Sequence, residues 1–497
     1  MRRAAQHEKG DNPLGSVYKG LSPKGDCPFI VMGKKGPGHR PMGKRDPFFC
    51  VKMTRQATLK TMYRLWWPLA LTWLMMAIEG PFLAAVIARM DESAVNLAAY
   101  GVAYAFGLIT EAPVIMLLSA STRLARSRAD YLRLRAFSIL LCGVVTLLLV
   151  FLLLPPVFKP LTSTLLGLTD DVATHVYQAM WLLLPWPSAI GMRRFYQGVL
   201  IAHHQPGRVA VGTTTRLLGM SITAGLLWSF SDLPGASLGA CALSAGVVLE
   251  ALSTRWLARQ AIAESLREKG DQTTMSSYTA LGRFYLPLAM TPLIGLSVHP
   301  VVTFFLGHGS RPLESLAVMP VLYSLTFVFR ALGLSFPEVA IATLKDGEEN
   351  RTVVRRFAVY LAVGLGGGLS LIAFTPLNVF WYATVSGLPP TLVQLAIPPL
   401  QIMALFPALT VAIGYQRAIL INNGVTMPVT VATAIEAAGI FVVLALLVLY
   451  SPLPGVTAAA VAYLLGRLLA LLYLCWPCTA WPNRKEAARE GLPRSDG

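Results

Sequence analysis

Long apolar runs, separated by short polar and charged stretches, fill the chain from residue 65 to residue 476. A helix that crosses a membrane needs about 20 predominantly apolar residues. With that length as the guide, the pattern predicts twelve membrane-spanning helices, at 65–88, 94–120, 134–155, 173–192, 208–230 and 236–258 in the first half and at 283–307, 313–342, 354–376, 392–413, 427–450 and 455–476 in the second.

The charged residues between these runs alternate from one loop to the next. The stretch "STRLARSRADYLRLR" holds five Arg and one Asp, and "MRRFYQGVLIAHHQPGR" holds three Arg and no acid. The intervening loops, such as "RMDES" and "KPLTSTLLGLTDD", are poor in Lys and Arg. Because basic loops stay in the cytoplasm, we expect a multi-pass protein with both termini cytoplasmic. The Ala-, Gly-, Arg- and Pro-rich composition favours a bacterial inner membrane.

A similar polar stretch with a Tyr-Gln pair occurs twice between apolar runs, as "RRFYQGVLIAHH" from residue 193 and "GYQRAILINN" from residue 414. The offset from Tyr196 to Tyr415 (415 minus 196) equals the offset from Gln197 to Gln416 (416 minus 197), and both are 219. The segments "WPLALTWLMMAIEGP" and "LPLAMTPLIGLSVHP" align at this offset too. Since each half has an even number of spans, the sequence predicts a parallel repeat with a pseudo-twofold axis along the membrane normal.

The two Tyr-Gln pairs are predicted to lie in the cytoplasmic loop between the fourth and fifth helices of each half. One interpretation is a loop that caps these helices and anchors them at the membrane surface. The other is a gating loop that takes part in substrate exit.

The spans divide the chain into five parts. The predicted organisation is a basic disordered cytoplasmic tail (1–60), a six-helix lobe (61–260), a cytoplasmic linker (261–282), a second six-helix lobe (283–476) and a short cytoplasmic tail (477–497).

The composition supports a membrane protein, and the basic N-terminal segment accounts for much of the net charge of +17. Only 13% of the residues are charged, whereas soluble proteins carry about 25%. Residues 1–64 hold fourteen Lys or Arg and four Asp or Glu. Basic segments beside membrane spans favour the anionic lipids of the cytoplasmic leaflet, so we expect lipid and not nucleic acid as their partner.

Several ionisable residues lie inside the predicted spans, where each costs a few kcal/mol unless it faces a cavity or a partner. They are Glu79, Glu111, Arg216, Arg330 and Glu436, with His299, Glu250, Glu338 and Arg467 nearer the helix ends. The arginines suit an anionic substrate and the glutamates a cationic one, so the sequence leaves the charge of the substrate open.

Glu111 and Arg330 are related by the same offset (330 minus 111) and have opposite charges. The repeat axis can bring them face to face across a central cavity, as a salt bridge that breaks between states. A static pair, or two separately solvated residues, would give the same pattern. Glu79 lies near Pro81, where a carboxylate in low dielectric can bind and release a coupling proton. His299 lies beside the position equivalent to Glu79 and extends this predicted polar site.

Three stretches resemble motifs for nucleotide binding, ester hydrolysis or redox chemistry, but each lacks a residue or a structural context that its motif requires. The stretch "GHRPMGKR" has Arg45 where a phosphate-binding loop needs Ser or Thr, and "GASLG" opens a helix instead of joining a strand to one. The pair in "CWPC" ends an apolar run, and the sequence shows no metal-ligand spacing. We therefore expect no enzyme activity, no cofactor and no metal.

With these features together, residues 60–476 resemble the MATE family and the wider multidrug/oligosaccharidyl-lipid/polysaccharide (MOP) flippase superfamily. "WWPLALTWLMMAIEG" and "LAAYGVAYAF" are also similar to the progressive ankylosis protein group, whose members are associated with export of anions such as pyrophosphate. The resemblance implies two lobes that rock around a central cavity, with Glu79 as the coupling acid, although MATE members more typically carry Asp.

The predicted function is therefore secondary active transport, in which a proton or sodium ion drives the efflux of a small amphipathic or charged solute. The alternatives are a flippase for lipid-linked oligosaccharide or polysaccharide and an anion exporter of the progressive ankylosis type.

Overall fold

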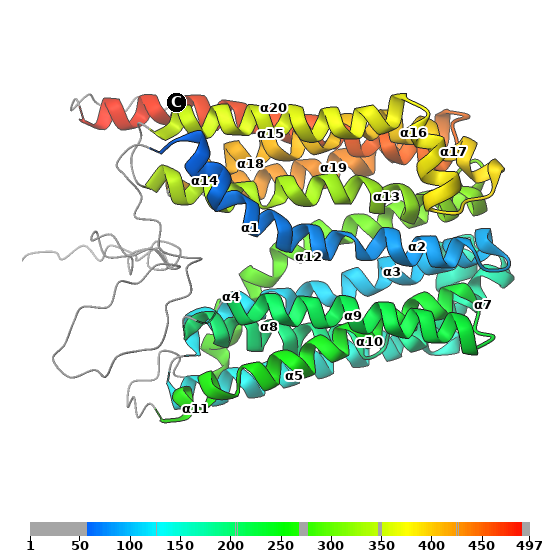
Figure 1. Cartoon of the computed structure of the whole chain (residues 1–497), viewed down its shortest axis with the longest axis horizontal. Helices are drawn as coiled ribbons and strands as arrows, with labels where there is room; N and C mark the ends of the chain where they lie inside the picture. Colours follow the sequence, from blue (N-terminus) through cyan, green and yellow to red (C-terminus); the bar gives the residue numbers. More distant parts are fainter. Residues whose placement is uncertain are drawn as a thin grey trace, which may run out of the picture. The chain divides into compact units, whose positions relative to one another are not determined.

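The structure, a computed structural model, describes residues 57–489 except 126, 204, 206, 268–276, 346–349, 424 and 426 (Figure 1). These described residues belong to one compact unit. The predicted tail (1–60) lies outside the described residues up to 56, as do part of the predicted linker and the end of the C-terminal tail. Every regular element of the described part is a helix, and one isolated bridge joins Ser310 to Pro454.

The first half contains the helices α1 (Leu59–Ala77), α2 (Glu79–Ala88), α3 (Ser93–Ile115), α4 (Leu117–Leu124), α5 (Arg128–Leu153), α6 (Pro155–Lys159), the π-helical turn η1 (Pro160–Leu165), α7 (Asp170–Leu182), α8 (Trp186–Ala202), α9 (Gly207–Phe230) and α10 (Gly235–Leu257). A short helix, α11 (Arg259–Arg267), follows.

The second half contains α12 (Tyr278–His308), α13 (Pro312–Leu334), α14 (Phe336–Lys345), α15 (Arg351–Phe374), α16 (Leu377–Val379), the π-helical turn η3 (Phe380–Val385), α17 (Pro390–Ile402), the 3₁₀ turn η4 (Met403–Leu405), α18 (Phe406–Asn422), α19 (Met427–Tyr450) and α20 (Gly455–Arg489).

The predicted parallel repeat is confirmed down to single residues. The starts of α3 and α13 differ by 219 (312 minus 93), and those of η1 and η3 differ by 220 (380 minus 160). Glu92 and Arg311, at the equivalent turns, both have positive φ angles of 49° and 53°. Gly167 and Gly387 follow the two π-helical turns with φ angles of 62° and 72°, a conformation that glycine adopts without steric cost.

The number of spans is compatible with the predicted twelve. Nine helices in the described part are long and apolar enough to cross a membrane, or ten if the bent pair Tyr278–Met290 and Pro292–His308 is one span. α7 with α8, and α9, fall outside this count. Their equivalents in the second half, Pro390–Asn422 and Met427–Tyr450, are inside it, so the count of twelve stays a prediction supported by the repeat.

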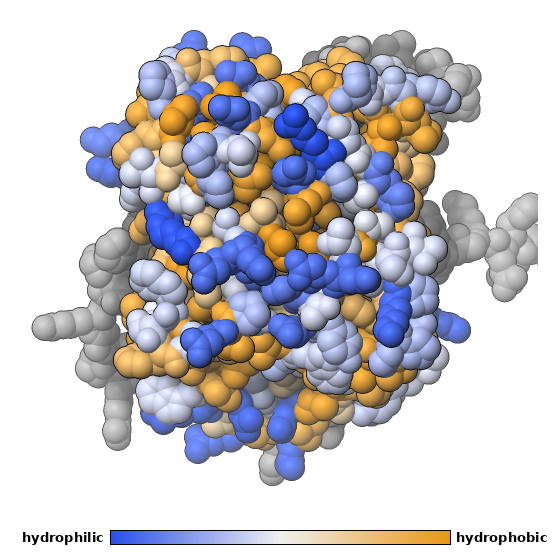
Figure 2. All heavy atoms as spheres, turned by 90° about the vertical axis from the view of Figure 1, so that its right-hand side faces the viewer, coloured by the Kyte–Doolittle hydropathy of each residue, from blue (hydrophilic) through white to orange (hydrophobic). Residues whose placement is uncertain are grey.

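The outer surface of the helices is apolar, as a lipid environment requires. Leu147 of α5 is 68% exposed, Phe230 of α9 is 84% exposed and Leu449 of α19 is 72% exposed. Figure 2 shows polar side chains gathered instead across the end of the molecule near α7, α16 and α17. Apolar sides and a polar end are the distribution of a multi-pass membrane protein.

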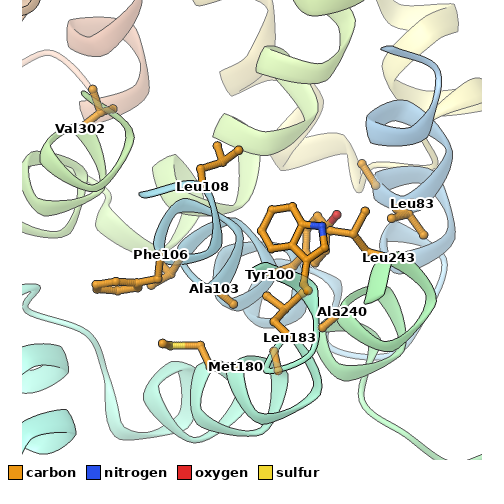
Figure 3. Close-up of a cluster of buried hydrophobic side chains, with 14 of the residues drawn as sticks. Leu83, Tyr100, Ala103, Phe106, Leu108, Met180, Leu183, Ala240, Leu243 and Val302 are labelled. Atoms are coloured by element: carbon orange, nitrogen blue, oxygen red, sulfur yellow. The ribbon is translucent and has the colours of Figure 1, made fainter. Parts of the chain in front are cut away.

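α3 lies at the centre of the apolar core. It packs against α7, α8 and α10 of its own half and against α12 and α13 of the other half. Figure 3 shows its Tyr100, Ala103 and Phe106 in one cluster with Met180 and Leu243. Small residues allow this approach, because a Cβ atom at Gly239 of α10 would lie 3.1 Å from the Tyr100 ring.

The first span of each half crosses to the other half at its start (Figure 1). Trp66 of α1 is buried among second-half residues, and its indole N–H donates a hydrogen bond to the carbonyl of Leu332 at 3.2 Å. Tyr285 of α12 lies 5.2 Å from the Phe137 ring and donates to the carbonyl of Pro113 at 2.5 Å. These crossed helices join the two halves.

Candidate functional site

The first span breaks at Glu79. α1 ends at Ala77, Ile78 separates the two helices, and Glu79 is the first residue of α2. Its side chain is 6% exposed and accepts a hydrogen bond from Nη2 of Arg216 on α9, with which it forms an ion pair. The break thus places a carboxylate inside the bundle, where an arginine from the fifth span neutralises it.

Glu250 of α10 is the central anion of this region. Its side chain is fully buried; Oε2 lies 2.6 Å from Nη1 of Arg193 and 3.8 Å from Nη1 of Arg216. Its other oxygen accepts a hydrogen bond from Nε2 of Gln197 at 3.3 Å. Arg216 therefore lies between two carboxylates. We call Glu79, Arg193, Gln197, Arg216 and Glu250 the first-half charge cluster.

Glu111 of α3 lies near this cluster but outside its ion pairs. The guanidinium groups of Arg193, Arg194 and Arg216 act on it electrostatically. Its Oε2 atom is buried and accepts no hydrogen bond from the residues that the structure describes. Glu111 and Arg330 form no ion pair with each other in the described residues, so a salt bridge that forms in one state and breaks in another stays a prediction.

The Tyr-Gln pairs lie within helices, so the prediction that they form loops is wrong. Tyr196 and Gln197 are buried in α8, and Tyr415 and Gln416 lie in α18. The helix continues because its polar side chains find partners on the sixth span of the same half. Gln197 donates to Glu250 at 3.3 Å, and Gln416 donates to Sγ of Cys475 at 3.1 Å. The duplicated glutamine ties the fourth span to the sixth, and a gating role for the pairs stays a prediction.

The second half holds a more basic group. Nε of Arg467 on α20 lies 2.7 Å from Oε1 of Glu436 on α19. The guanidinium carbons of Arg330 and Arg467 lie 4.6 and 4.9 Å from the centre of the Phe406 ring. Arg417 of α18, whose charge acts on Arg467, donates to the hydroxyl of Thr433 at 3.1 Å. We call Arg330, Phe406, Arg417, Glu436 and Arg467 the second-half charge cluster.

His299 lies beside the second-half charge cluster, and its extension of the polar site around Glu79 stays a prediction. Its ring lies 5.0 Å from the ring of Tyr323, edge to face. The hydroxyl of Tyr323 in turn accepts a hydrogen bond from Nη1 of Arg330 at 3.4 Å. The residue equivalent to Glu79 in this half is Val298 (79 plus 219), so the second half lacks that carboxylate.

At the end of the molecule near α7 and α17, the halves meet through a pair of equivalent contacts. Nη2 of Arg89, at the end of α2, donates to the carbonyls of Thr384 and Val385 in η3 at 2.7 and 2.9 Å. His308, the repeat equivalent of Arg89 (89 plus 219), ends α12. A Cβ atom at Gly167 would lie 3.5 Å from the His308 ring. We call these two contacts the end clasp.

The sequence pattern missed Arg193, Arg194 and Arg417, because polar residues at the edge of a span indicated a loop. The spacing of Arg193 and Gln197 holds the missing signal. Residues four apart lie on one face of a helix, and both of these side chains reach Glu250. In the described part, no group of three His, Cys, Asp or Glu side chains is arranged to hold a metal ion.

No family model and no curated protein sequence matches the chain. Solved structures do match its fold. An inward-facing multidrug resistance MATE family transporter of the MOP superfamily aligns with a TM-score of 0.63 at 14% identity, over 83% of this chain and 99% of that one. The lipid II flippase MurJ, in an inward closed conformation, aligns with a TM-score of 0.64 at 14% identity, over 83% and 87%.

A MOP superfamily transporter from Pyrococcus furiosus aligns with a TM-score of 0.56 at 15% identity, over 86% of this chain and 97% of that one. The chain has the MOP fold. The resemblance seen in the sequence is thereby confirmed at the level of the fold. In this MOP fold, the two charge clusters lie one in each half, on the fourth to sixth spans and on the elements packed against them.

Proposed function

We propose that the protein is a secondary active transporter that moves a small anionic or amphipathic solute across the membrane without covalent change. Transport occurs by alternating access of two lobes, 61–260 and 283–476, and is driven by a proton or a sodium ion. The protein resides in the bacterial inner membrane with both termini in the cytoplasm. This orientation is supported by the basic loops on the side where the chain begins and ends.

The observation that carries the proposal is the charge excess in the second half. The second-half charge cluster holds three guanidinium groups and one carboxylate, Glu436. Two of these cations face the same Phe406 ring. Buried cations without anions are costly in a bilayer. An anionic solute that reaches this cluster would supply the missing negative charge, with Arg330 and Arg467 as its ligands.

Coupling is assigned to the first-half charge cluster. A proton or sodium ion that binds Glu79 neutralises its carboxylate and so weakens the ion pair with Arg216. Oε1 of Glu79 is buried and has no hydrogen-bond partner in the described part of the chain, which leaves one oxygen available to the ion. Once Glu79 is neutral, Arg216 would pair with Glu250 alone. The break between α1 and α2 would then be less constrained, and a change in the angle between these helices would move one lobe relative to the other.

The end clasp supports the alternating-access part of the proposal. One contact joins the first span of the first half to the π-helical turn η3, and the other joins the first span of the second half to Gly167, just after η1. Opening this end therefore requires Arg89 to leave the carbonyls of η3. Glu111, with one oxygen unpartnered, and His299, beside Tyr323, stay proposed contributors to the cavity between the lobes.

A lipid-linked substrate is the second candidate, because MurJ shares the fold over most of both chains. Lipid-linked sugars carry phosphate groups, so they satisfy the same arginines as a soluble anion. The two candidates differ in whether the transported molecule is soluble.

The test of the substrate is transport in proteoliposomes. Uptake of inorganic pyrophosphate, of an organic cation and of a fluorescent lipid-linked sugar is compared for the wild type, Arg330→Gln and the control Arg283→Gln, whose residue is exposed. We expect Arg330→Gln to raise the half-saturating anion concentration about tenfold, the effect of one charged hydrogen-bonding partner. Uptake of the organic cation alone would refute the anionic substrate.

The test of coupling compares Glu79→Gln with Glu264→Gln, a change at an exposed residue of α11. Imposed proton and sodium gradients are applied in turn. We expect the gradient-driven uptake to disappear in Glu79→Gln while counterflow, which needs no coupling ion, continues. If Glu79→Gln responds to the gradient as the wild type does, the coupling role of Glu79 is wrong although transport itself stands.

A further inference from the structure

A pocket of about 500 Å³ opens in the second half, and no residue of either charge cluster lines it. Its walls are α15 and α20, and its floor is α18, which packs against both of them. The pocket lies where α15 begins and where the membrane span of α20, Gly455–Cys478, ends. It is therefore at the end of the spans that carries the predicted cytoplasmic loops.

The mouth of the pocket is basic. Arg351, Thr352 and Arg355, from the first turns of α15, line it and are exposed. The N-terminus of a helix also presents free backbone N–H groups and a partial positive charge. Gln416 also lines the pocket, and its Oε1 is buried without a hydrogen-bond partner among the described residues. The pocket thus offers two guanidinium groups and a hydroxyl to an anion, and one acceptor to a nearby donor.

The rest of the lining is apolar and continues onto the lipid-facing surface. Ala358, Val359, Ala362 and Ile419 line the pocket. Val363, one turn further along α15 from Val359, is 68% exposed. The groove therefore leads from a basic mouth into the region occupied by lipid acyl chains.

The first half fills the corresponding place with its own chain. α10 ends at Leu257, and after Ala258 the chain turns into α11, which packs against α5 and α8. Ser265 of α11 is buried there and bonds to the Ala125 carbonyl at 3.3 Å. The equivalent of Ala258 is Cys478 (258 plus 220), where α20 continues without a turn. No described helix covers the second-half pocket.

We propose that this pocket binds a membrane phospholipid through its phosphodiester. Arg351 and Arg355 hold the phosphate oxygens, for which arginine offers paired donors. A hydroxyl or ammonium of the headgroup donates to Oε1 of Gln416, and an acyl chain lies along Ala362 and Val363. The lipid takes the place that α11 has in the first half, and the site is independent of the transported solute.

The test is native mass spectrometry of the full-length protein, stripped of lipid and then titrated with phosphatidylglycerol. The double variant Arg351→Gln/Arg355→Gln is compared with Arg356→Gln, which removes an adjacent exposed arginine that does not line the pocket. We expect the tightest lipid adduct to weaken about tenfold or more in the double variant and to stay unchanged in Arg356→Gln. Equal weakening in both would show only nonspecific attraction to basic residues and would overturn the proposal.

Two further arms separate the sources of the phosphate. Glycerophosphoglycerol, which has the phosphodiester headgroup without acyl chains, is expected to compete poorly with phosphatidylglycerol. If it competes at equal concentration, the site binds soluble phosphate esters and the lipid assignment is wrong. Ala362→Trp, which fills the apolar part while leaving the arginines, is expected to weaken the lipid adduct; an unchanged adduct would place the lipid elsewhere.

Discussion

In each half of the chain, a glycine of the sixth span lies against the backbone of a charged residue in the fifth. A Cβ atom at Gly246 would lie 3.0 Å from the carbonyl oxygen of Arg216, and one at Gly466 would lie 2.9 Å from that of Glu436. The two glycines and the two charged residues are related by the same offset, 220 in each case (466 minus 246 and 436 minus 216). The backbones therefore meet in the same way, whereas the charge beside the contact is inverted.

The inversion shows which properties of the repeat are fixed by packing and which are free to diverge. Close approach of two helices depends on small residues and backbone atoms, and these recur in both halves. The charged side chains of the residues at this contact, Arg216 and Glu436, differ between the halves. In the first half Arg216 lies between Glu79 and Glu250, and in the second Glu436 faces an excess of arginines. One scaffold thus carries a neutral ion-pair network and a cationic cluster.

The largest effect is expected where the ion-pair network is densest. Glu250→Ala leaves Arg193 without its carboxylate in a fully buried place and deprives Gln197 of its acceptor. We expect a loss of about 3–5 kcal/mol in the free energy of unfolding, the range for breaking a buried pair. Glu436→Ala removes one ion pair at a slightly more exposed residue and should cost about 1.5–3 kcal/mol.

Both losses are measured by reversible unfolding of the purified protein in mixed micelles, with Glu264→Ala on the exposed face of α11 as the control. A larger loss for Glu436→Ala than for Glu250→Ala would contradict the distinction between a network and a single pair. Because the readout is stability, the result does not depend on knowing the substrate.

The sequence is sufficient for the fold because a bilayer imposes strong constraints. The apolar runs, the alternation of basic loops and the constant offset between the halves predict a parallel repeat, and the structure has it. The predicted boundary of the fourth span is wrong, since the pattern ends it at 192 and α8 ends at Ala202. Polar residues near a membrane surface look like a loop when their partner, here Glu250, belongs to another span far along the chain.

The site is predictable only in part for the same reason. The sequence indicates that Glu79, Glu111 and Arg330 lie inside spans, but not which charges they meet. The offset of Glu111 and Arg330 predicts a contact across the axis in one state, whereas in this structure the charges that act on Glu111 and the rings beside Arg330 belong to their own halves. Ion pairs depend on the rotation of each helix about its axis, which an offset along the chain does not determine.

The second prediction concerns the shared packing. Gly246→Ala and Gly466→Ala each place a methyl group within 3.0 Å of a backbone carbonyl. We expect each to lower the free energy of unfolding by about 1–3 kcal/mol, the cost of overpacking. Gly225→Ala is the control, because a Cβ atom there meets nothing within 4 Å, and it should be neutral or slightly stabilising. Unequal costs at Gly246 and Gly466 would show that packing has diverged too.

The third prediction concerns the end clasp. Arg89→Ala removes two hydrogen bonds to the carbonyls of Thr384 and Val385 in the other half. His308→Ala removes the ring that lies near Gly167, and the hydrogen bond that it breaks, to the Phe304 carbonyl at 2.9 Å, lies within α12. We expect Arg89→Ala to shift the population toward the state open at this end by about tenfold, and His308→Ala by much less. Distances between spin labels on α7 and α17 report the population. An equal shift in both variants would contradict the expectation that the Arg89 contact is stronger than the His308 contact.

The smallest effect is expected at the two equivalent turns with left-handed backbone. Glu92 and Arg311 have φ angles of 49° and 53°, both are exposed, and their charges are opposite. Glycine adopts this conformation without the Cβ clash, so Glu92→Gly and Arg311→Gly should each stabilise the protein by about 0.5–1 kcal/mol. Thermal unfolding of the two variants tests whether the gain is equal. The backbone strain is the same at both turns and does not depend on the charge of the side chain. If only one variant is stabilised, the charged side chain at the other turn must itself contribute to stability.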